Sequence, residues 1–337
     1  MSGGKTERLE GSTGVGRAAD ILRAGGTVAF PTETVYGLGA DAAQPEAVAA
    51  LYAAKGRPAF NPLIAHVTDL DAAFALGAFS ADARRLALAV WPGPLTLVVP
   101  YGGGPLVCDL ARAGLDTVAV RVPAHPTAHA LLEAFRGPVV APSANRSGHV
   151  SPTTAAHVMG DLSGLIDAVL EDGASPVGVE STIIACTGPE PRLLRPGGLT
   201  RAMAEEVLGR PLADAASNDA DRPLAPGRLA SHYAPTIPVR LDVTQVADGE
   251  ALLTFAGARP PGSAGAAAVL DLSPTGDLQE AAARLYGALR ALDATGATAI
   301  AVVPLPRVGL GEAIADRLAR AAAPRLPAPP RLDLPES

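Results

Sequence analysis

The chain has almost no lysine and very little asparagine. Only two of its 27 basic residues are lysines, and one of them lies in the segment Lys55-Gly-Arg57-Pro-Ala-Phe-Asn61-Pro-Leu-Ile-Ala-His66. Arginine is used nearly everywhere else in the chain. A lysine kept at this position indicates a need for a compact ammonium charge rather than a planar guanidinium group. Two of the three asparagines, Asn61 and Asn145, also fall in Gly/Pro-rich segments between apolar runs. Rare polar residues gathered in this way are typical of a polyanion or nucleotide site.

Cysteine and long apolar runs are scarce as well. Cys108 and Cys186 are far apart and show no CxxC or Cys/His ligand spacing, which argues against a disulfide framework and against structural zinc. No uninterrupted apolar run reaches 18 residues, and the first ten residues contain no apolar signal region. We therefore expect a soluble protein of a reducing cytosol that is neither exported nor held in a membrane.

Positive charge is not in excess. The formal net charge is −7, which argues against binding nucleic acid over the whole surface, because such binding needs a basic field. A basic pocket inside an acidic shell stays open. A mass of 33.9 kDa with 48% apolar residues is enough for one large or two medium domains, each with its own core.

Helical and strand patterns are interspersed along the first 210 residues. An amphipathic pattern predicts a helix over 14–25 that ends at Gly25-Gly26, followed by a strand over 27–30. Further helices are expected at 45–54, 69–77, 81–90 and 127–135, and further strands at 63–67, 95–99, 117–122, 138–141, 166–170, 181–185 and 191–195. This order predicts an α/β sheet domain over residues 1–210.

The composition changes after residue 210. Residues 211–236 are rich in Ala, Asp, Asn and Pro and are interpreted as a linker, although Pro226-Gly-Arg-Leu-Ala-Ser-His-Tyr-Ala-Pro235 is too aromatic and basic for a mere spacer. A small open α/β domain is expected over 237–325, with strands at 237–241, 251–255, 267–271 and 298–303 and helices at 277–292 and 310–322. Residues 326–337 form a Pro-rich tail that we expect to be frayed.

Basic residues lie in or beside loops at the ends of predicted strands, where open α/β sheets bind ligands. Lys55, Arg57, Arg121 and Arg195 occupy such positions and together could hold a triphosphate, with the arginines bidentate on its oxygens. No phosphate-binding glycine loop of known type is present. The stretch Gly3-Gly4-Lys5-Thr6 lacks the earlier glycine and the preceding strand of a Walker A motif, and no GxGxxG precedes a helix.

Several polar motifs occur in order along residues 15–240. They are Pro31-Thr-Glu-Thr34-Val-Tyr-Gly-Leu, Lys55-Gly-Arg57, Ser143-Ala-Asn145, Gly178-Val-Glu-Ser181-Thr-Ile, Leu194-Arg195-Pro-Gly and, in the linker, His232-Tyr233-Ala-Pro. On these motifs the chain resembles the long, two-domain form of the YrdC-like threonylcarbamoyl-AMP synthases. The resemblance implies a twisted mixed sheet with helices around a central cavity, followed by a small Rossmann-like α/β domain.

The resemblance also implies a reaction. The family is a group of nucleotidyltransferases that makes threonylcarbamoyl-adenylate and pyrophosphate from L-threonine, bicarbonate and ATP with Mg²⁺. A partner threonylcarbamoyl transferase complex then modifies adenosine 37 of tRNAs that read codons starting with A, and a weak direct contact with tRNA stays open. Since no covalent enzyme intermediate is required, the protein is expected chiefly to position anions and to exclude water.

The same resemblance implies the site residues. Around L-threonine it places Thr34, His66, Arg121, the backbone of Ala141, and Ser181, with Arg121 pairing the carboxylate. Around ATP it places Arg57, Asn61, Thr117, Ser143, Ser151 and Arg195, with Tyr233 closing over the nucleotide as a lid. Lys55, Arg57 and Asn145 are expected to act on phosphate and carbamate. Metal ligands stay unassigned, because no carboxylate cluster stands out and Glu33 and Glu180 are only the nearest candidates.

Other interpretations stay open at this point. Many relatives have further basic residues where this chain has Arg228-Leu-Ala-Ser231, which leaves the phosphate contacts of the lid open. From the residues alone, His66 is more typical of a satisfied core histidine, and Tyr233 of a residue packed between domains. An RNA-binding module would bind RNA with a steep salt dependence and release no pyrophosphate. A carbamoyl transferase would use carbamoyl phosphate instead of bicarbonate and ATP.

Overall fold

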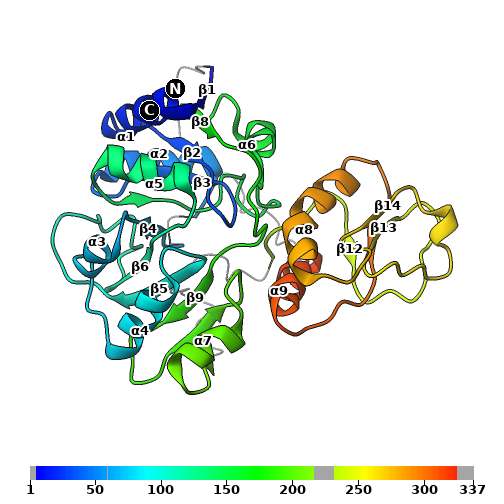
Figure 1. Cartoon of the computed structure of the whole chain (residues 1–337). Coiled ribbons are helices and arrows are strands. Elements are labelled where there is room, and N and C mark those ends of the chain that lie inside the picture. Colours follow the sequence, from blue (N-terminus) through cyan, green and yellow to red (C-terminus); the bar gives the residue numbers. More distant parts are fainter. Residues whose placement is uncertain (1–4, 59, 216–230, 325–337) are drawn as a thin grey trace, which may run out of the picture.

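The computed structural model describes residues 5–58, 60–215 and 231–324 (Figure 1). Two stretches for which expectations were stated, the linker portion 216–230 and the tail 326–337, lie outside the described residues. The described part of the chain forms two sheets, a large one before the linker and a small one after it. Its helices include none that is long and apolar enough to cross a membrane.

The large sheet is mixed and has 11 strands among the described residues. They are β1 Glu7–Glu10, β2 Val28–Phe30, β3 Gly37–Asp41, β4 Ile64–His66, β5 Leu95–Pro100, β6 Thr117–Arg121, β7 Val139–Val140, β8 Ala168–Glu171, β9 Thr182–Ala185, β10 Arg192–Arg195 and β11 Ala213–Asp214. Their spatial order is β1-β8-β2-β3-β7-β4-β6-β5-β9-β10-β11. Because this order interleaves distant segments, the loops that carry the polar motifs come from strands that are neighbours in space.

Helices cover the large sheet and several of them have clear end signals. They are α1 Gly11–Arg23, α2 Pro45–Lys55, α3 Leu70–Phe74, α4 Ala81–Val90, α5 Pro126–Phe135, α6 Ala155–Leu162 and α7 Arg201–Leu208. Helix α2 begins with a proline, whose missing N–H costs nothing at a first turn. It ends at Gly56, which adopts the left-handed conformation (φ 59°) that favours glycine. Lys55 is therefore fixed as the last helical residue.

The small sheet is parallel and carries two long helices. Its strands are β12 Val239–Arg240, β13 Ala251–Thr254, β14 Val269–Asp271 and β15 Ile300–Val302, in the order β12-β15-β13-β14, and its helices are α8 Leu278–Asp293 and α9 Leu310–Ala322. Figure 1 shows α8 and α9 on the side of this domain that faces the large one. Asp277 caps the start of α8 by accepting from the backbone N–H groups of Gln279 and Glu280.

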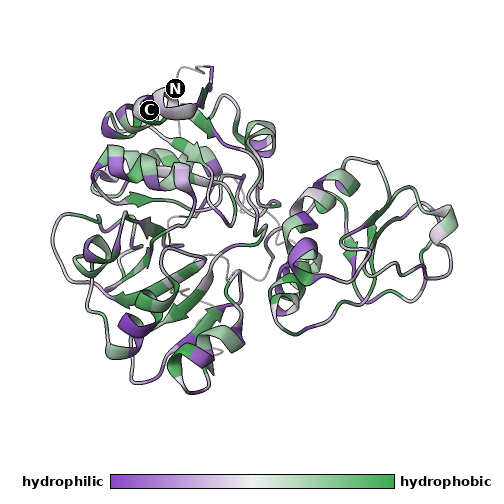
Figure 2. Cartoon of the chain, viewed as in Figure 1, coloured by the Kyte–Doolittle hydropathy of each residue, from purple (hydrophilic) through white to green (hydrophobic). Residues whose placement is uncertain are grey.

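Apolar residues concentrate along the strands of both sheets, as the green colour in Figure 2 shows. The core of the small domain is not confined to that domain. Val35, Val150 and Val179, all from the large domain, pack into the same buried cluster as Leu285 and Ile314. The two domains therefore share apolar surface, which favours a fixed contact over a loose tether.

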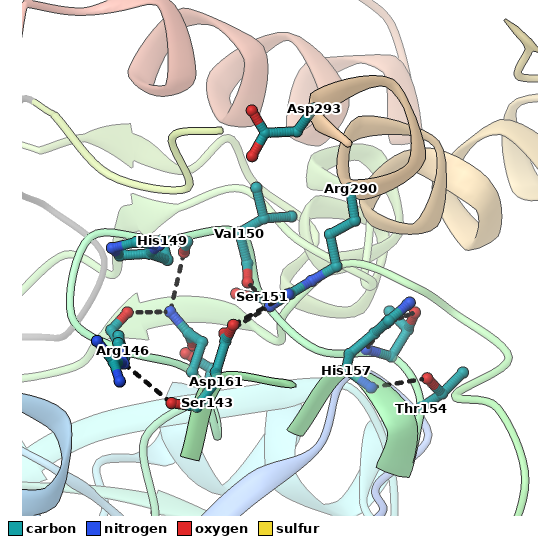
Figure 3. A network of polar contacts seen from close by, with 12 residues as sticks. Ser143, Arg146, His149, Val150, Ser151, Thr154, His157, Asp161, Arg290 and Asp293 are labelled. Carbon is teal, nitrogen blue, oxygen red and sulfur yellow. Dashed lines mark hydrogen bonds and ion pairs between the residues drawn. The ribbon is translucent and has the colours of Figure 1, made fainter. Parts of the chain in front are cut away.

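Polar contacts reinforce the same interface. The Nη2 atom of Arg290 on α8 donates to Asp161 Oδ2 at 2.7 Å and also to the Val150 carbonyl oxygen (Figure 3). Arg201 on α7 pairs with Glu312 on α9 at 3.0 Å. Gly178 approaches the backbone of α8 so closely that an added Cβ would lie 2.3 Å from the carbonyl oxygen of Ala282.

The structure differs from the sequence expectations at several elements. The strands β1, β3 and β11 and the short helices α6 and α7 were not predicted. Helix α1 also begins and ends earlier than expected, at Gly11–Arg23. Strand β1 pairs in parallel with β8, a strand more than 150 residues away, so its existence depends on a contact that local sequence does not reveal.

Candidate active site

A polar pocket lies where the loops of the large sheet meet the start of the second domain. It is lined by Thr32, Thr34, Val35, Gly37, Arg57, Ile64, His66, Arg121, Ala141, Pro142, Ser143, Glu180, Ser181, Arg195, His232 and Tyr233. Its empty volume is about 500 Å³, part of which is open to solvent.

Most of the residues expected at the substrates line this pocket. They are Thr34, Arg57, His66, Arg121, Ala141, Ser143, Ser181, Arg195 and Tyr233. Lys55, Asn61, Asn145 and Ser151 are buried just behind the lining. Thr117, at the start of β6, is half-buried opposite Pro100 and is not among the lining residues. The roles assigned to these residues stay predictions, and the structure gives their positions and contacts.

Lys55 and Asn145 hold the loop that carries Ser143. The Lys55 ammonium is 3% exposed, lies 2.5 Å from the carbonyl oxygen of Ser143 and also donates to that of Asn145. Burial lowers the pKa of Lys55 well below its ordinary value. The Asn145 amide donates to the carbonyl oxygens of Arg146 and His149, at 2.7 and 2.9 Å. Both side chains therefore fix backbone around the pocket.

Arg57 follows Gly56 and is held by carbonyl oxygens. Its guanidinium donates to the backbone carbonyls of Asn61 and Pro62, at 3.3 and 3.2 Å from Nη2. Burial lowers the pKa of Arg57 to about 10, which leaves it charged near neutral pH. The Tyr52 hydroxyl also donates to the Asn61 carbonyl, at 2.9 Å, so the segment that bends around Arg57 is braced from α2.

Arg121 ends β6 and forms a buried ion pair. Its Nη2 lies 2.6 Å from Glu33 Oε1, and Glu33 Oε2 accepts from the backbone N–H of Ala124. Arg121 was expected to pair the threonine carboxylate, and in this structure Glu33 is its carboxylate partner. The guanidinium has donors beyond that pair, and its Nε has no hydrogen-bond partner among the described residues.

His66 ends β4 beside Arg121 and is 3% exposed. Its Nδ1 lies 3.0 Å from the carbonyl oxygen of Ile64, and its ring meets that of Phe30 edge to face at 6.0 Å. Burial, and then the positive charge of Arg121, lowers the pKa of His66 to about 3. The imidazole is therefore neutral at physiological pH and adds no positive charge to this end of the pocket.

Ser181 and Arg195 both line the pocket and contact each other. Arg195 Nη2 donates to the carbonyl oxygen of Ser181 at 2.8 Å, and the Ser181 hydroxyl lies 2.7 Å from that of Thr96. Gly197 follows Arg195, and an added Cβ there would lie 2.3 Å from the carbonyl oxygen of Glu180. Only glycine fits this approach, which brings the loop after β10 directly onto the Glu180–Ser181 backbone.

Glu180 also lines this pocket. From the sequence it was named only as one of the two nearest candidates for a metal ligand. It accepts from the Ser151 hydroxyl at 2.6 Å, from the Tyr286 hydroxyl at 2.9 Å and from Arg317 Nε at 2.7 Å. Burial raises the pKa of Glu180, but the positive charges of Arg317 and Arg195 outweigh it and lower that pKa to about 2. Ser151, which the resemblance assigns to ATP, donates to this carboxylate in the structure.

His232 and Tyr233, from the end of the linker, also line the pocket. Tyr233 has a positive φ of 60°, and its ring stacks on that of Tyr286 at 5.8 Å. Burial lowers the pKa of His232 to about 3, so this imidazole is also neutral. The position of Tyr233 agrees with both interpretations of it, because the ring lines the pocket and packs between the domains.

A protein-held magnesium ion does not fit these side chains. The described residues contain no group of three or more His, Cys, Asp or Glu side chains able to hold a metal. The nearest carboxylates, Glu33 and Glu180, are each engaged by an arginine. Magnesium is commonly carried by substrate phosphates and water, with few protein ligands.

Comparison with known proteins gives the family. A family model described as "Telomere recombination" matches residues 20–197, and one described as "Threonylcarbamoyl-AMP synthase, C-terminal domain" matches residues 199–323. A threonylcarbamoyl-AMP synthase of Bacillus subtilis is 40% identical over 325 residues, which cover 93% of this chain and 94% of that protein. The chain belongs to the threonylcarbamoyl-AMP synthase family.

Another member of the threonylcarbamoyl-AMP synthase family, from Pyrococcus abyssi, is 41% identical over 92% of this chain and 94% of its own. The crystal structure described as P. abyssi Sua5 complexed with L-threonine superposes with a TM-score of 0.85 at 37% identity, covering 94% of this chain and 97% of that one. The resemblance inferred from the motifs is therefore confirmed, and so is the fold of a mixed-sheet domain followed by a small α/β domain.

Proposed function

We propose that this protein makes L-threonylcarbamoyladenylate and pyrophosphate from L-threonine, bicarbonate and ATP. The observation that carries the proposal is the convergence of Arg57, Arg121 and Arg195 on one pocket. Three buried guanidinium groups at one pocket are costly unless anions balance them, and Glu33 and Glu180 supply only two carboxylates. A triphosphate, a carbamate and an amino-acid carboxylate supply that balance.

The pocket lining contains residues for both substrates. We assign Thr34, His66 and Arg121 to L-threonine, where the neutral imidazole leaves Arg121 as the cation for the carboxylate. We assign Arg57, Ser143 and Arg195 to ATP, with Tyr233 as the ring that covers it. The ion pair between Arg121 and Glu33 keeps that arginine oriented before substrate arrives.

The chemistry needs positioning rather than a covalent intermediate. The threonine nitrogen attacks the carbon of CO₂ and loses a proton, which gives a carbamate. With bicarbonate the same attack also breaks one C–O bond of the bicarbonate, and that oxygen leaves as water with the proton from nitrogen and the bicarbonate proton. A carbamate oxygen then attacks the α-phosphorus of ATP, and the bond from that phosphorus to the bridging oxygen breaks to release pyrophosphate. Arg57 and Arg195 offset the charge that develops on the phosphates. Substrates that fill the pocket displace from it the water that would destroy the carbamate.

Magnesium enters this proposal with the triphosphate, since the protein carboxylates are engaged elsewhere. The product then passes to a threonylcarbamoyl transferase complex, which acts on position 37 of tRNAs that read codons beginning with A. Because the acceptor is tRNA, we place the reaction in the cytoplasm.

Pyrophosphate release by the purified protein tests the proposal. The assay compares each of the twenty amino acids, with and without bicarbonate, and repeats threonine with carbamoyl phosphate in place of bicarbonate. We expect release that requires both threonine and bicarbonate. Release without an amino acid, or no release under any condition, would contradict the proposal, and turnover of carbamoyl phosphate would favour a carbamoyl transferase.

A further inference from the structure

Arg317 is a fully buried cation in a helix of the second domain. It lies on α9, its side chain is 0% exposed, and its Nε donates across the interface to Glu180 Oε2 at 2.7 Å. Its Nη1 is 2.5 Å from Asp316 Oδ2, and its guanidinium carbon lies 5.0 Å from the centre of the Tyr233 ring. Burying a guanidinium costs several kcal/mol unless partners compensate it, so a simple tether between domains does not need one here.

A second ion pair across the same interface shows the difference. Arg201 and Glu312 also join the large domain to α9, but both side chains are about 30% exposed and neither lines the pocket. Exposed pairs of this kind contribute little to stability. Arg317, in contrast, contacts a carboxylate that is itself part of the pocket wall.

Glu180 has two arginines near it. Arg317 from the second domain donates to its carboxylate, while Arg195 from β10 directs Nη2 to the carbonyl oxygen of Ser181. Both positive charges act on Glu180. A carboxylate between two guanidinium groups pairs with whichever is better placed, so the presence of one arginine decides how the other is oriented.

We propose that Arg317 is a positioning residue of the active pocket: by holding the Glu180 carboxylate, it keeps Arg195 directed at Ser181 and at the nucleotide. Tyr286, also from the second domain, assists by donating its hydroxyl to the same carboxylate. The second domain thus takes part in the reaction through charge balance across the interface. This inference rests on the proposed function, because it assigns Arg195 to the nucleotide.

The consequence of removing Arg317 follows from the geometry. Glu180 would remain buried with Ser151 and Tyr286 as neutral donors and with Arg195 as the remaining cation whose charge acts on it. Arg195 would turn toward the carboxylate and away from the triphosphate. Replacing Glu180 as well would remove the charge that attracts Arg195, so the second substitution should repair the first.

The experiment uses the full chain and six variants. They are Arg317→Met, Glu180→Gln, the double variant Arg317→Met/Glu180→Gln, Tyr286→Phe, Tyr286→Phe/Glu180→Gln and the control Arg201→Met. Readouts are the kcat and KM for ATP and for threonine, direct ATP affinity by calorimetry, and thermal unfolding. We expect Arg317→Met to lower kcat/KM for ATP by at least about 30-fold, as loss of one partner of a buried charge pair does elsewhere. The double variant should recover most of that loss, while Arg201→Met stays within about twofold of the unmodified protein.

Tyr286→Phe keeps the inference testable if Arg317→Met does not fold. It removes one hydroxyl donor from Glu180 with little change of shape, so kcat/KM for ATP should fall less, about 3- to 10-fold. In the Glu180→Gln background the same substitution should have no further effect. Equal losses in Arg317→Met and Arg201→Met, or a double variant no better than Arg317→Met, would overturn the inference.

The two proposals fail in different ways. If the unmodified protein releases no pyrophosphate, the proposed function is wrong. If it is active but the double variant shows no recovery in turnover or ATP affinity, the function stands and only the role of Arg317 is wrong.

Discussion

The Lys55 ammonium lies 2.5 Å from the carbonyl oxygen of Ser143, so the last residue of α2 supports the loop after β7 from behind the pocket. A second carbonyl, that of Asn145, accepts from the same nitrogen. Both acceptors are backbone atoms in a buried turn. A compact ammonium with three donors suits this position better than a planar guanidinium group. This contact gives a physical reason for one of the two lysines in the chain.

Replacing Lys55 should therefore destabilise the protein as well as slow it. In Lys55→Met, two buried carbonyl oxygens lose their donor, at a cost of about 1–3 kcal/mol each in free energy of unfolding. Lys55→Arg should not restore activity. Urea unfolding and pyrophosphate release measure the two effects, and the exposed lysine variant Lys5→Met is the control. Full stability of Lys55→Met with lost turnover would instead favour direct action of the ammonium on phosphate or carbamate.

Arg57 and Arg195 should matter mainly for the transition state. If each guanidinium meets phosphate charge directly, its replacement by alanine should cost about 2–4 kcal/mol of transition-state stabilisation, measured as a fall in kcat/KM for ATP. Arg192 lies on the same strand as Arg195 but at its exposed end, so Arg192→Ala is a matched control. Unchanged turnover in both Arg57→Ala and Arg195→Ala would contradict the assignment of these two arginines to the active site.

The sequence was informative where local chemistry fixes local structure. Pro45 and Gly56 mark the two ends of α2, and β5 and β6 are rich in valine and leucine, so these elements were predicted within a residue or two. Helices α6 and α7 were missed, although Thr154 and Thr200 cap them, because eight residues give too short an apolar pattern. Motifs, rather than periodicity, located the pocket loops.

The part of the site that was not predicted from the sequence depends on contact between the two domains. Glu180 and Arg317 are 137 residues apart, and nothing in either local sequence indicates that they meet. Their contact requires α9 to pack on the loop before β9, which is a property of the assembled fold. Within the large domain, Glu33 and Arg121 are likewise 88 residues apart and meet only in the folded chain.

Acidification should destabilise the fold through its buried histidines. His66 and His232 have folded pKa values of about 3 against an ordinary 6.5, so the unfolded chain binds more protons between these values. The free energy of unfolding should fall as pH drops below about 6.5, by up to about 1.4 kcal/mol per pH unit for each histidine. Burial also lowers the pKa of His125 and of His157, which adds to the same trend.

Urea unfolding between pH 7.5 and pH 5 measures this slope. The window excludes Glu180, whose stabilising effect is present above its ordinary pKa of 4.5 and is lost only as pH falls from there toward about 2. His66→Gln should remove one histidine's share of the slope. A stability that is flat between pH 6.5 and pH 5 would contradict burial of the neutral imidazoles.

The buried pair of Arg121 and Glu33 should behave unlike a surface pair. Arg121→Met leaves the Glu33 carboxylate buried without its cation, which should cost about 3–5 kcal/mol in free energy of unfolding. Adding Glu33→Gln should return much of that stability, but not the affinity for threonine. The exposed pair Arg8–Glu171 is the control, and Arg8→Met should cost less than about 1 kcal/mol. If Arg121→Met and Arg8→Met lowered the free energy of unfolding by the same amount, this would contradict the burial of the pair between Arg121 and Glu33.

Gly178 should be indispensable for seating α8 on the catalytic domain. Its φ is +75°, and an added Cβ would lie 2.3 Å from the Ala282 carbonyl oxygen and 2.4 Å from the Cα of Ala283. Gly178→Ala therefore combines a left-handed backbone penalty of about 1–2 kcal/mol with the cost of moving a whole helix. Because Glu180 lies two residues further on, displacement of α8 also withdraws Tyr286 from its carboxylate.

We expect Gly178→Ala to lower the unfolding temperature and to reduce pyrophosphate release together. Gly188→Ala is the matched control, because no atom lies within 4 Å of its added Cβ and its φ is not left-handed, so it should change neither. A Gly178→Ala protein with normal melting and normal turnover would mean that α8 does not rest on this loop in solution. The charge balance at Glu180 would then have to be maintained without the second domain.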